Sequence, residues 1–324
     1  MKTYNQNGTI SESEYVFADN DFFAIQQYIN NGRSRFFYPG DKLIQELDLK
    51  LICLSNKFAT TYFRNLKLYY EELSIFPLGL IQGGQNSDML IDKKQFLGLV
   101  GQFSKNYDSL YRHLYIADCQ YLVSTVQNLL LSAEHCYIQY YMQITQIDCQ
   151  YPNFDGTFLI SSEDTIKLLF YLETFFTKLY SVLDLMVKII YELESPVESF
   201  VELTKLRSAD KLWGDRKRLK MNGCRGTIFE DCATIKTIES LRNEAVHNGS
   251  WEINPKVYLK RENRRTVERY MLFPDFLNGR LSSAKNRRHF FSTETKVNDM
   301  LVLIHDEFYQ KLLHTLQAIE LKYK

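Results

Sequence analysis

Proline and glycine are scarce in this chain, which has 6 Pro and 14 Gly in 324 residues. Few positions can therefore break a helix or form a tight turn. The long segments between these residues repeat apolar side chains at spacings of three and four, the pattern of amphipathic helices. There is no internal repeat and no low-complexity tract. The sequence predicts a mainly α protein.

Paired cysteine motifs are also absent. The six cysteines are scattered, with no CxxC pair and no spacing typical of a disulfide framework. We expect reduced, mostly buried thiols, as in a cytoplasmic protein. The neighbouring histidines and cysteines do not have zinc-ligand spacing, so no metal site is expected.

No long uninterrupted apolar run is present. The first residues are polar and lack the apolar core of a signal peptide. The most hydrophobic segment, residues 166–193, is interrupted by six charged side chains, which argues against a membrane span. We expect a cytoplasmic protein without membrane contact.

Several sequence motifs of common enzyme classes are missing. The chain has no Gly-rich phosphate loop, no Ser-centred nucleophile elbow and no paired carboxylates of a metal nuclease. The missing phosphate loop argues against ATP hydrolysis, and no cofactor is expected.

Net charge is zero, but the charge is unevenly distributed. Residues 256–290 carry ten basic and three acidic side chains and form what we call the basic arm. Such runs are commonly solvated faces, yet their bunching in this half of the chain favours an anionic partner. The candidate RNA-binding residues are Lys260, Arg261, Arg264, Arg265, Arg287 and Arg288.

Turn-forming residues concentrate at 149–163, which predicts a boundary between two regions. Residues 1–150 would form a helical N-terminal region with a sensor, regulatory or dimerisation role, and residues 151–324 a helical bundle with the basic arm. In the first region, the apolar repeat predicts one long helix over residues 41–76.

The second region is expected to contain three helices, over residues 163–193, 227–246 and 294–323. Residues 257–273 could form a small β-hairpin with its tip near Asn263, or an irregular arm.

One hexapeptide has residue types that are more typical of a functional site than of a packed core: Arg242-Asn243-Glu244-Ala245-Val246-His247. It lies at the end of a predicted helix, and Asn248-Gly249 behind it suits a helix C-terminus. Asn243 and His247 are four residues apart and share a helical face, and Arg242 can reach them on its long side chain. Asp164, Glu173 and Asp184, on the preceding helix, are candidates to support Arg242.

This hexapeptide and the flanking helices resemble the HEPN superfamily, helical-bundle proteins that include many prokaryotic toxin and antiviral ribonucleases. The resemblance covers roughly residues 156–324. It implies metal-independent cleavage of RNA, in which the ribose 2′-OH attacks the adjacent phosphate and leaves a 2′,3′-cyclic phosphate. Arg242, His247 and Asn243 would be the catalytic residues.

The resemblance also implies a homodimer, because family members form the site from two facing domains and this chain has one such motif. The partners would be RNA, a second copy of the chain and an antitoxin or regulatory protein. In the family branch paired with a nucleotidyltransferase antitoxin, a Tyr follows the His by two places, where this chain has Gly249. Regulation by that route is therefore not expected.

Two other interpretations stay open. Arg242 could simply pair with Glu239 or Glu244 on the surface while His247 caps the helix. Alternatively, the chain is a non-catalytic HEPN-like module that binds RNA, nucleotide or a protein partner.

Overall fold

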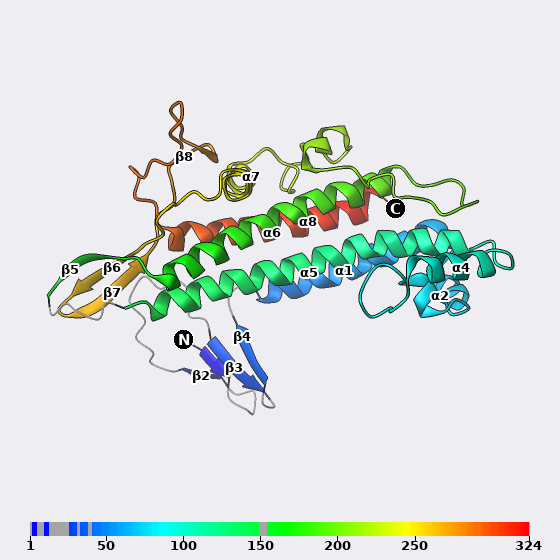
Figure 1. Cartoon of the computed structure of the whole chain (residues 1–324), viewed down its shortest axis with the longest axis horizontal. Helices are drawn as coiled ribbons and strands as arrows, with labels where there is room; N and C mark the ends of the chain where they lie inside the picture. Colours follow the sequence, from blue (N-terminus) through cyan, green and yellow to red (C-terminus); the bar gives the residue numbers. More distant parts are fainter. Residues whose placement is uncertain are drawn as a thin grey trace. The chain divides into compact units, whose positions relative to one another are not determined.

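The computed structural model describes residues 2–4, 10–12, 26–30, 33–37, 41–148 and 154–323. It has 58% helix and 9% strand, so the prediction of a mainly α protein is confirmed. The helices are α1 (Asp41–Tyr62), α2 (Leu66–Leu73), α3 (Leu78–Ile81), α4 (Lys93–Phe103), α5 (Leu110–Gln146), α6 (Glu163–Glu194), α7 (Ala233–His247), α8 (Val297–Lys322) and the 3-10 helix η1 (Trp213–Arg218) (Figure 1).

Short antiparallel strands make up the rest of the regular structure. They are β1 (Lys2–Tyr4), β2 (Ile10–Glu12), β3 (Gln26–Asn30), β4 (Arg33–Phe37), β5 (Gly156–Ile160), β6 (Val257–Glu262), β7 (Arg265–Tyr270), β8 (Phe276–Leu277) and β9 (Arg280–Leu281). The pairs are β1–β2, β3–β4, β5–β6–β7 and β8–β9. Among the described residues of the N-terminal region, the strands precede Asp41 and the helices begin there.

The helix predicted over residues 41–76 is broken in the structure, so that prediction is wrong in its middle. Helix α1 ends at Tyr62 and α2 begins at Leu66. The side chain of Asn65 accepts a hydrogen bond from the backbone N–H of Leu68 at 2.9 Å. This N-cap satisfies a donor that would otherwise lack a partner at the start of α2. Apolar spacing alone does not reveal the interruption, because it continues in phase across it.

Of the two alternatives for residues 257–273, the structure shows the β-hairpin, which is part of a larger sheet. Strands β6 and β7 pair around Asn263 and Arg264, whose φ angles of 51° and 60° suit a tight hairpin turn. The Asp155 carboxylate accepts hydrogen bonds from both of their backbone N–H groups, at 2.9 and 2.8 Å. Strand β5, within the predicted boundary segment at residues 149–163, pairs with β6.

The chain forms two compact units. Unit 1 is Met1–Gln45, Leu130–Tyr180 and Asp231–Lys311, and unit 2 is Glu46–Leu129, Ser181–Glu230 and Leu312–Lys324. Each unit takes segments from both sides of residue 150, because α5, α6 and α8 continue from one unit into the other. The predicted single boundary between residues 150 and 151 differs from this division.

The core of unit 1 has a buried ionic cluster between α5 and α8. Nε2 of His305 lies 2.6 Å from a Glu134 carboxylate oxygen, and Nδ1 lies 2.9 Å from Asp306. The imidazole stacks between the rings of Tyr137 and Tyr309, with centroids 4.3 and 4.4 Å away. Burial lowers the pKa of His305, but the charge of Glu134 and the hydrogen bond to Asp306 outweigh burial and raise it to about 9.

Helix α7 positions the hexapeptide in unit 1. It buries Ile235, Ile238 and Leu241, and the Thr234 hydroxyl bonds to Glu307 of α8. The helix predicted over 227–246 thus begins later, at Ala233, and ends at His247.

The expected C-terminus of α7 is confirmed. Asn248 caps the helix, and Gly249 has a φ of 90°, a conformation that glycine adopts without strain.

Candidate functional site at the end of helix α7

The side chains of Arg242, Asn243 and His247 meet at the C-terminal end of α7. Nη1 of Arg242 lies 3.0 Å from Oδ1 of Asn243 and 3.1 Å from Nε2 of His247. A guanidinium has donors only, so both partner atoms accept hydrogen bonds. In this arrangement Nε2 of His247 carries no hydrogen and is a basic nitrogen. The three residues expected to act together are therefore in direct contact.

Tyr180 of α6 provides the surface on which Arg242 rests. The guanidinium carbon lies 4.6 Å from the centre of the Tyr180 ring, within the range of a cation–π interaction. A guanidinium is planar, so stacking on the Tyr180 ring fixes the plane of the Arg242 guanidinium. Its N–H groups point outward in that plane and stay available for hydrogen bonds. The hexapeptide does not predict a role for Tyr180, because nothing in it indicates which residue of another helix faces it.

The three carboxylates considered as support for Arg242 have other surroundings. Asp164 accepts a hydrogen bond from Lys167 at 3.1 Å, and Asp184 accepts one from the backbone N–H of Trp213 at 2.6 Å. Glu173 is half-buried, and burial raises the pKa of its carboxyl group. Tyr180 thus takes the supporting position that was expected of an acidic residue.

Glu244, the third residue of the hexapeptide, is buried at 4% exposure. Its carboxylate lies 3.2 Å from Nη1 of Arg288 and 3.1 Å from Nε2 of His289, and it accepts a hydrogen bond from the Asn248 amide at 3.0 Å. The interpretation in which Glu244 pairs with Arg242 on the surface is wrong, since Glu244 faces inward and holds the basic arm. A carboxylate on the otherwise apolar face of an amphipathic helix is the sequence signal that could have indicated this contact.

Asp275 anchors the part of the basic arm that follows β7. It accepts hydrogen bonds from the hydroxyl and backbone N–H groups of Ser292 and Thr293, at 2.6 to 3.0 Å. The hydroxyl groups of Ser292 and Thr293 and their N–H groups lower the pKa of the Asp275 carboxyl group. The segment at Asp275 is therefore held against the segment at Ser292 and Thr293, just before α8 begins.

The β8–β9 turn seats the same arm against α7. Gly279 has a φ of 78°, and its carbonyl accepts a hydrogen bond from the Ser240 hydroxyl at 3.1 Å. A Cβ atom at this position would lie 2.2 Å from the Ala233 carbonyl oxygen, so the close approach requires glycine.

A polar groove of about 680 Å³ lies between α7 and the arm. Its lining residues are Glu239, Ser240, Asn243, Glu244, His247, Asn248, Arg280, Leu281, Ser283, Lys285 and Arg288. Three of them, Arg280, Lys285 and Arg288, are cations, and two, Glu239 and Glu244, are carboxylates. Glu244 is paired with Arg288, and Asn243 and His247 line the same space as Arg280 and Lys285. The groove can therefore receive an anionic group beside the imidazole.

The six candidate RNA-binding residues do not form one surface patch around this groove. Arg288 lines it, and the Arg287 backbone pairs with Ala284 in the same segment. The remaining candidates, Lys260, Arg261, Arg264 and Arg265, belong to the β6–β7 hairpin and are not among the groove residues.

Part of the charge on the hairpin is engaged internally. Lys260 pairs with Glu262 at 2.8 Å, and Arg261 donates to the Arg264 carbonyl at 2.8 Å. Two groove cations, Arg280 and Lys285, were in the predicted basic arm but were not among the chosen candidates.

Within residues 41–148 and 154–323, no group of three His, Cys, Asp or Glu side chains could hold a metal ion. The helices in the described part of the chain include none long and apolar enough to cross a membrane. Comparison of the chain with protein-family models, with curated proteins and with solved structures gave no match.

Proposed function

We propose that this chain is a HEPN-like, metal-independent endoribonuclease of a toxin or antiviral defence system, acting as a cytoplasmic homodimer. The observation that carries the proposal is the contact of Arg242 Nη1 with both Asn243 and His247 at the edge of the polar groove. A basic imidazole nitrogen can accept the proton of a ribose 2′-OH, and a guanidinium and an amide can stabilise and orient the phosphoryl oxygens during phosphodiester transfer.

In the proposed reaction, His247 Nε2 takes the proton of the 2′-OH as that oxygen bonds to phosphorus. The bond from phosphorus to the 5′-oxygen breaks, and the leaving oxygen receives the proton that His247 accepted from the 2′-OH. The products are a 2′,3′-cyclic phosphate and a 5′-OH. An entering phosphate would accept the Arg242 N–H that now points at His247, which frees Nε2 for the substrate hydroxyl. Asn243 would then orient the phosphate through its amide N–H group.

One chain supplies one such cluster, and a second copy would supply the facing one. The cations that line the groove, Arg280, Lys285 and Arg288, suit the neighbouring phosphates of an RNA strand. Tyr180 holds the guanidinium without neutralising it, so its charge stays available for the phosphoryl oxygens.

The test uses the purified full-length chain with labelled RNA in EDTA. Cleavage should persist, leave cyclic phosphate ends and fall by about a hundredfold or more in Arg242→Ala and in His247→Ala, the usual scale for losing such a group. Arg225→Ala and His314→Ala change exposed residues of the same types outside the groove and should retain full activity. Equal activity in all four variants, or products with 3′-OH ends, would overturn the proposal.

The β6–β7 hairpin favours a second candidate, a non-catalytic module that binds RNA. Its basic residues stand apart from the groove lining, so they could hold a strand without presenting it to His247. Under this candidate, RNA binds without being cut. Affinity would then fall when Lys260, Arg261, Arg264 and Arg265 are changed to Ala, and Arg242→Ala would leave it unchanged.

A further inference from the structure

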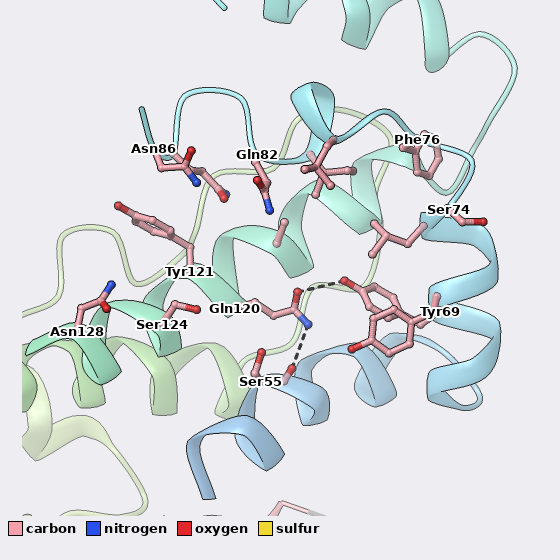
Figure 2. Close-up of a pocket in the computed structure, with 16 residues that line it drawn as sticks. Ser55, Tyr69, Ser74, Phe76, Gln82, Asn86, Gln120, Tyr121, Ser124 and Asn128 are labelled. Atoms are coloured by element: carbon pink, nitrogen blue, oxygen red, sulfur yellow. Dashed lines mark hydrogen bonds between the residues drawn. The ribbon is translucent and has the colours of Figure 1, made fainter. Parts of the chain in front are cut away.

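A second pocket lies in unit 2, apart from the elements of the groove. Its volume is about 860 Å³, within the range of small-molecule sites. Figure 2 shows Gln82 and Asn86, from the segment after α3, facing Tyr121, Ser124 and Asn128 of α5. The sixteen lining residues are Ser55, Tyr69, Tyr70, Leu73, Ser74, Phe76, Leu78, Ile81, Gln82, Gln85, Asn86, Ala117, Gln120, Tyr121, Ser124 and Asn128.

None of these sixteen side chains is charged, although 24% of the chain is Asp, Glu, Lys or Arg. The lining combines carboxamides, hydroxyl groups and aromatic rings. A phosphate or carboxylate entering this pocket would lose water without gaining a cation, which is unfavourable. The lining therefore selects an uncharged ligand that has both hydrogen-bonding groups and an apolar face.

One wall of the pocket is held rigid by Gln120. Its amide N–H donates to the Ser55 carbonyl at 3.3 Å, and its amide oxygen accepts from the Tyr69 hydroxyl at 3.1 Å (Figure 2). Both the N–H group and the oxygen of this carboxamide are hydrogen-bonded within the protein, so Gln120 fixes the pocket wall and is not assigned a contact with the ligand.

The facing segment is fixed as well. The Gln85 amide donates to Asp118 of α5 at 2.9 Å. A Cβ atom on Gly83 would lie 2.5 Å from the Gly79 carbonyl oxygen, so the segment after α3 packs as closely as glycine allows. The pocket is therefore formed before any ligand enters, which reduces the entropy lost on binding.

Three polar groups remain available at the centre of this rigid frame. In the part of the chain that the structure describes, the Gln82 amide and the hydroxyl groups of Tyr121 and Ser124 make no hydrogen bond. Tyr121 is 45% exposed, which is a large fraction for an aromatic residue. A free carboxamide has adjacent donor and acceptor groups, the arrangement that pairs with the edge of a nucleobase, and a tyrosine ring offers a stacking face.

We propose that this pocket binds a nucleobase, presented as a nucleoside without a charged phosphate. The base would stack on Tyr121 and present its edge to Gln82, with Ser124 contacting the base or ribose. This proposal does not depend on ribonuclease activity, because no residue of the hexapeptide takes part.

The test is titration calorimetry of the full-length chain with adenosine, guanosine, cytidine and uridine. At least one nucleoside should bind with a Kd below about 1 mM, and its 5′-monophosphate should bind no more tightly because no cation lines the pocket. Tyr121→Ala should weaken binding at least about fivefold, the low end for loss of one base stack, and Tyr121→Phe should retain it. Gln82→Ala should also weaken binding.

Gln102→Ala, at an exposed glutamine of α4 outside the pocket, is the matched control and should bind as the unchanged chain does. A nucleobase could also come from a short single-stranded RNA. Because no cation lines the pocket, that RNA should bind there no more tightly than the nucleoside does.

Three results would overturn the proposal. The first is that no nucleoside gives a heat of binding at about 10 mM, since a Kd above that concentration is far weaker than a small-molecule site normally has. The second is that Tyr121→Ala binds the nucleoside as tightly as the unchanged chain does. The third is that the chain binds a neutral disaccharide and none of the four nucleosides.

Discussion

Glu244 of α7 and Arg288 of the basic arm form an ion pair at 3.2 Å, with the carboxylate buried and the guanidinium half-exposed. The contact attaches the arm to the helix that carries the hexapeptide, one residue away from Asn243. The same carboxylate also meets His289 at 3.1 Å. A residue inside the motif therefore has a structural role, and the groove depends on it.

Glu244→Gln should loosen the arm and lower the free energy of unfolding. The buried carboxylate lies among donors, and an amide cannot accept from Arg288 and His289 with the same strength. Because Arg288 is half-exposed and can regain water, we expect a loss of only about 1 to 2 kcal/mol in urea unfolding.

Glu239→Gln makes the same change on the same helix, at a carboxylate without an ion pair in the described structure, and should have little effect. Equal stability of the two variants would contradict the role assigned to Glu244.

Tyr180→Leu should reduce RNA cleavage while Tyr180→Phe retains it, if the proposed function holds. Leucine removes the aromatic face under Arg242, whereas phenylalanine keeps it. A cation–π contact of about 0.5 to 2 kcal/mol corresponds to a fall in rate of roughly two- to thirtyfold. Single-turnover kinetics at saturating RNA measures the effect, because the guanidinium would be misplaced in the transition state. Equal rates for the Phe and Leu variants would show that the ring does not position Arg242.

Gly279→Ala should detach the β8–β9 turn from α7. A Cβ atom would overlap the Ala233 carbonyl oxygen, and the φ of 78° is unfavourable for alanine. Strain of this kind costs on the order of 1 to 3 kcal/mol. Limited proteolysis should show faster cleavage within residues 276–290, together with a lower melting temperature.

Gly98→Ala is the matched control with the opposite sign. Gly98 is an exposed residue within α4 with open space around its Cβ position. Alanine there should stabilise the helix by about 0.5 to 1 kcal/mol. Unchanged proteolysis of Gly279→Ala would mean that the turn does not need its close approach to α7.

The His305–Glu134 pair should make stability fall as pH rises above neutrality. The pKa of His305 is about 9 in the folded chain, against 6.5 for an ordinary histidine. Between these values the folded state holds a proton that the unfolded state has lost, so the free energy of unfolding decreases with pH. The contribution is fully present below pH 6.5 and is lost as the pH passes 9.

Chemical unfolding at several pH values from 6 to 9.5 measures this slope, within the window set by the two pKa values. Glu134→Gln removes the main charge that raises the pKa of His305 and should flatten the slope. Glu163→Gln, at an exposed carboxylate, should leave it unchanged. A steep slope retained in Glu134→Gln would assign the pH dependence to another group.

Local signals in the sequence determined much of the secondary structure. Apolar spacing predicted the long helices, and the hairpin with its tip near Asn263 was one of the two alternatives for residues 257–273. The break before α2 escaped prediction because a single Asn65 cap decided it. Strand β5 escaped because its partner β6 lies about a hundred residues later.

For the candidate site, sequence alone determined that Arg242, Asn243 and His247 could meet, since helical geometry places residues one, four and five apart within reach of one another. Only the tertiary structure decided that Tyr180 supports the guanidinium, that Glu244 faces inward to Arg288, and that Arg280 and Lys285 rather than the hairpin cations line the groove. These contacts join segments that are far apart in the sequence, and packing and charge in three dimensions determine which residues meet. The periodicity of one segment contains no information about its partners in another segment.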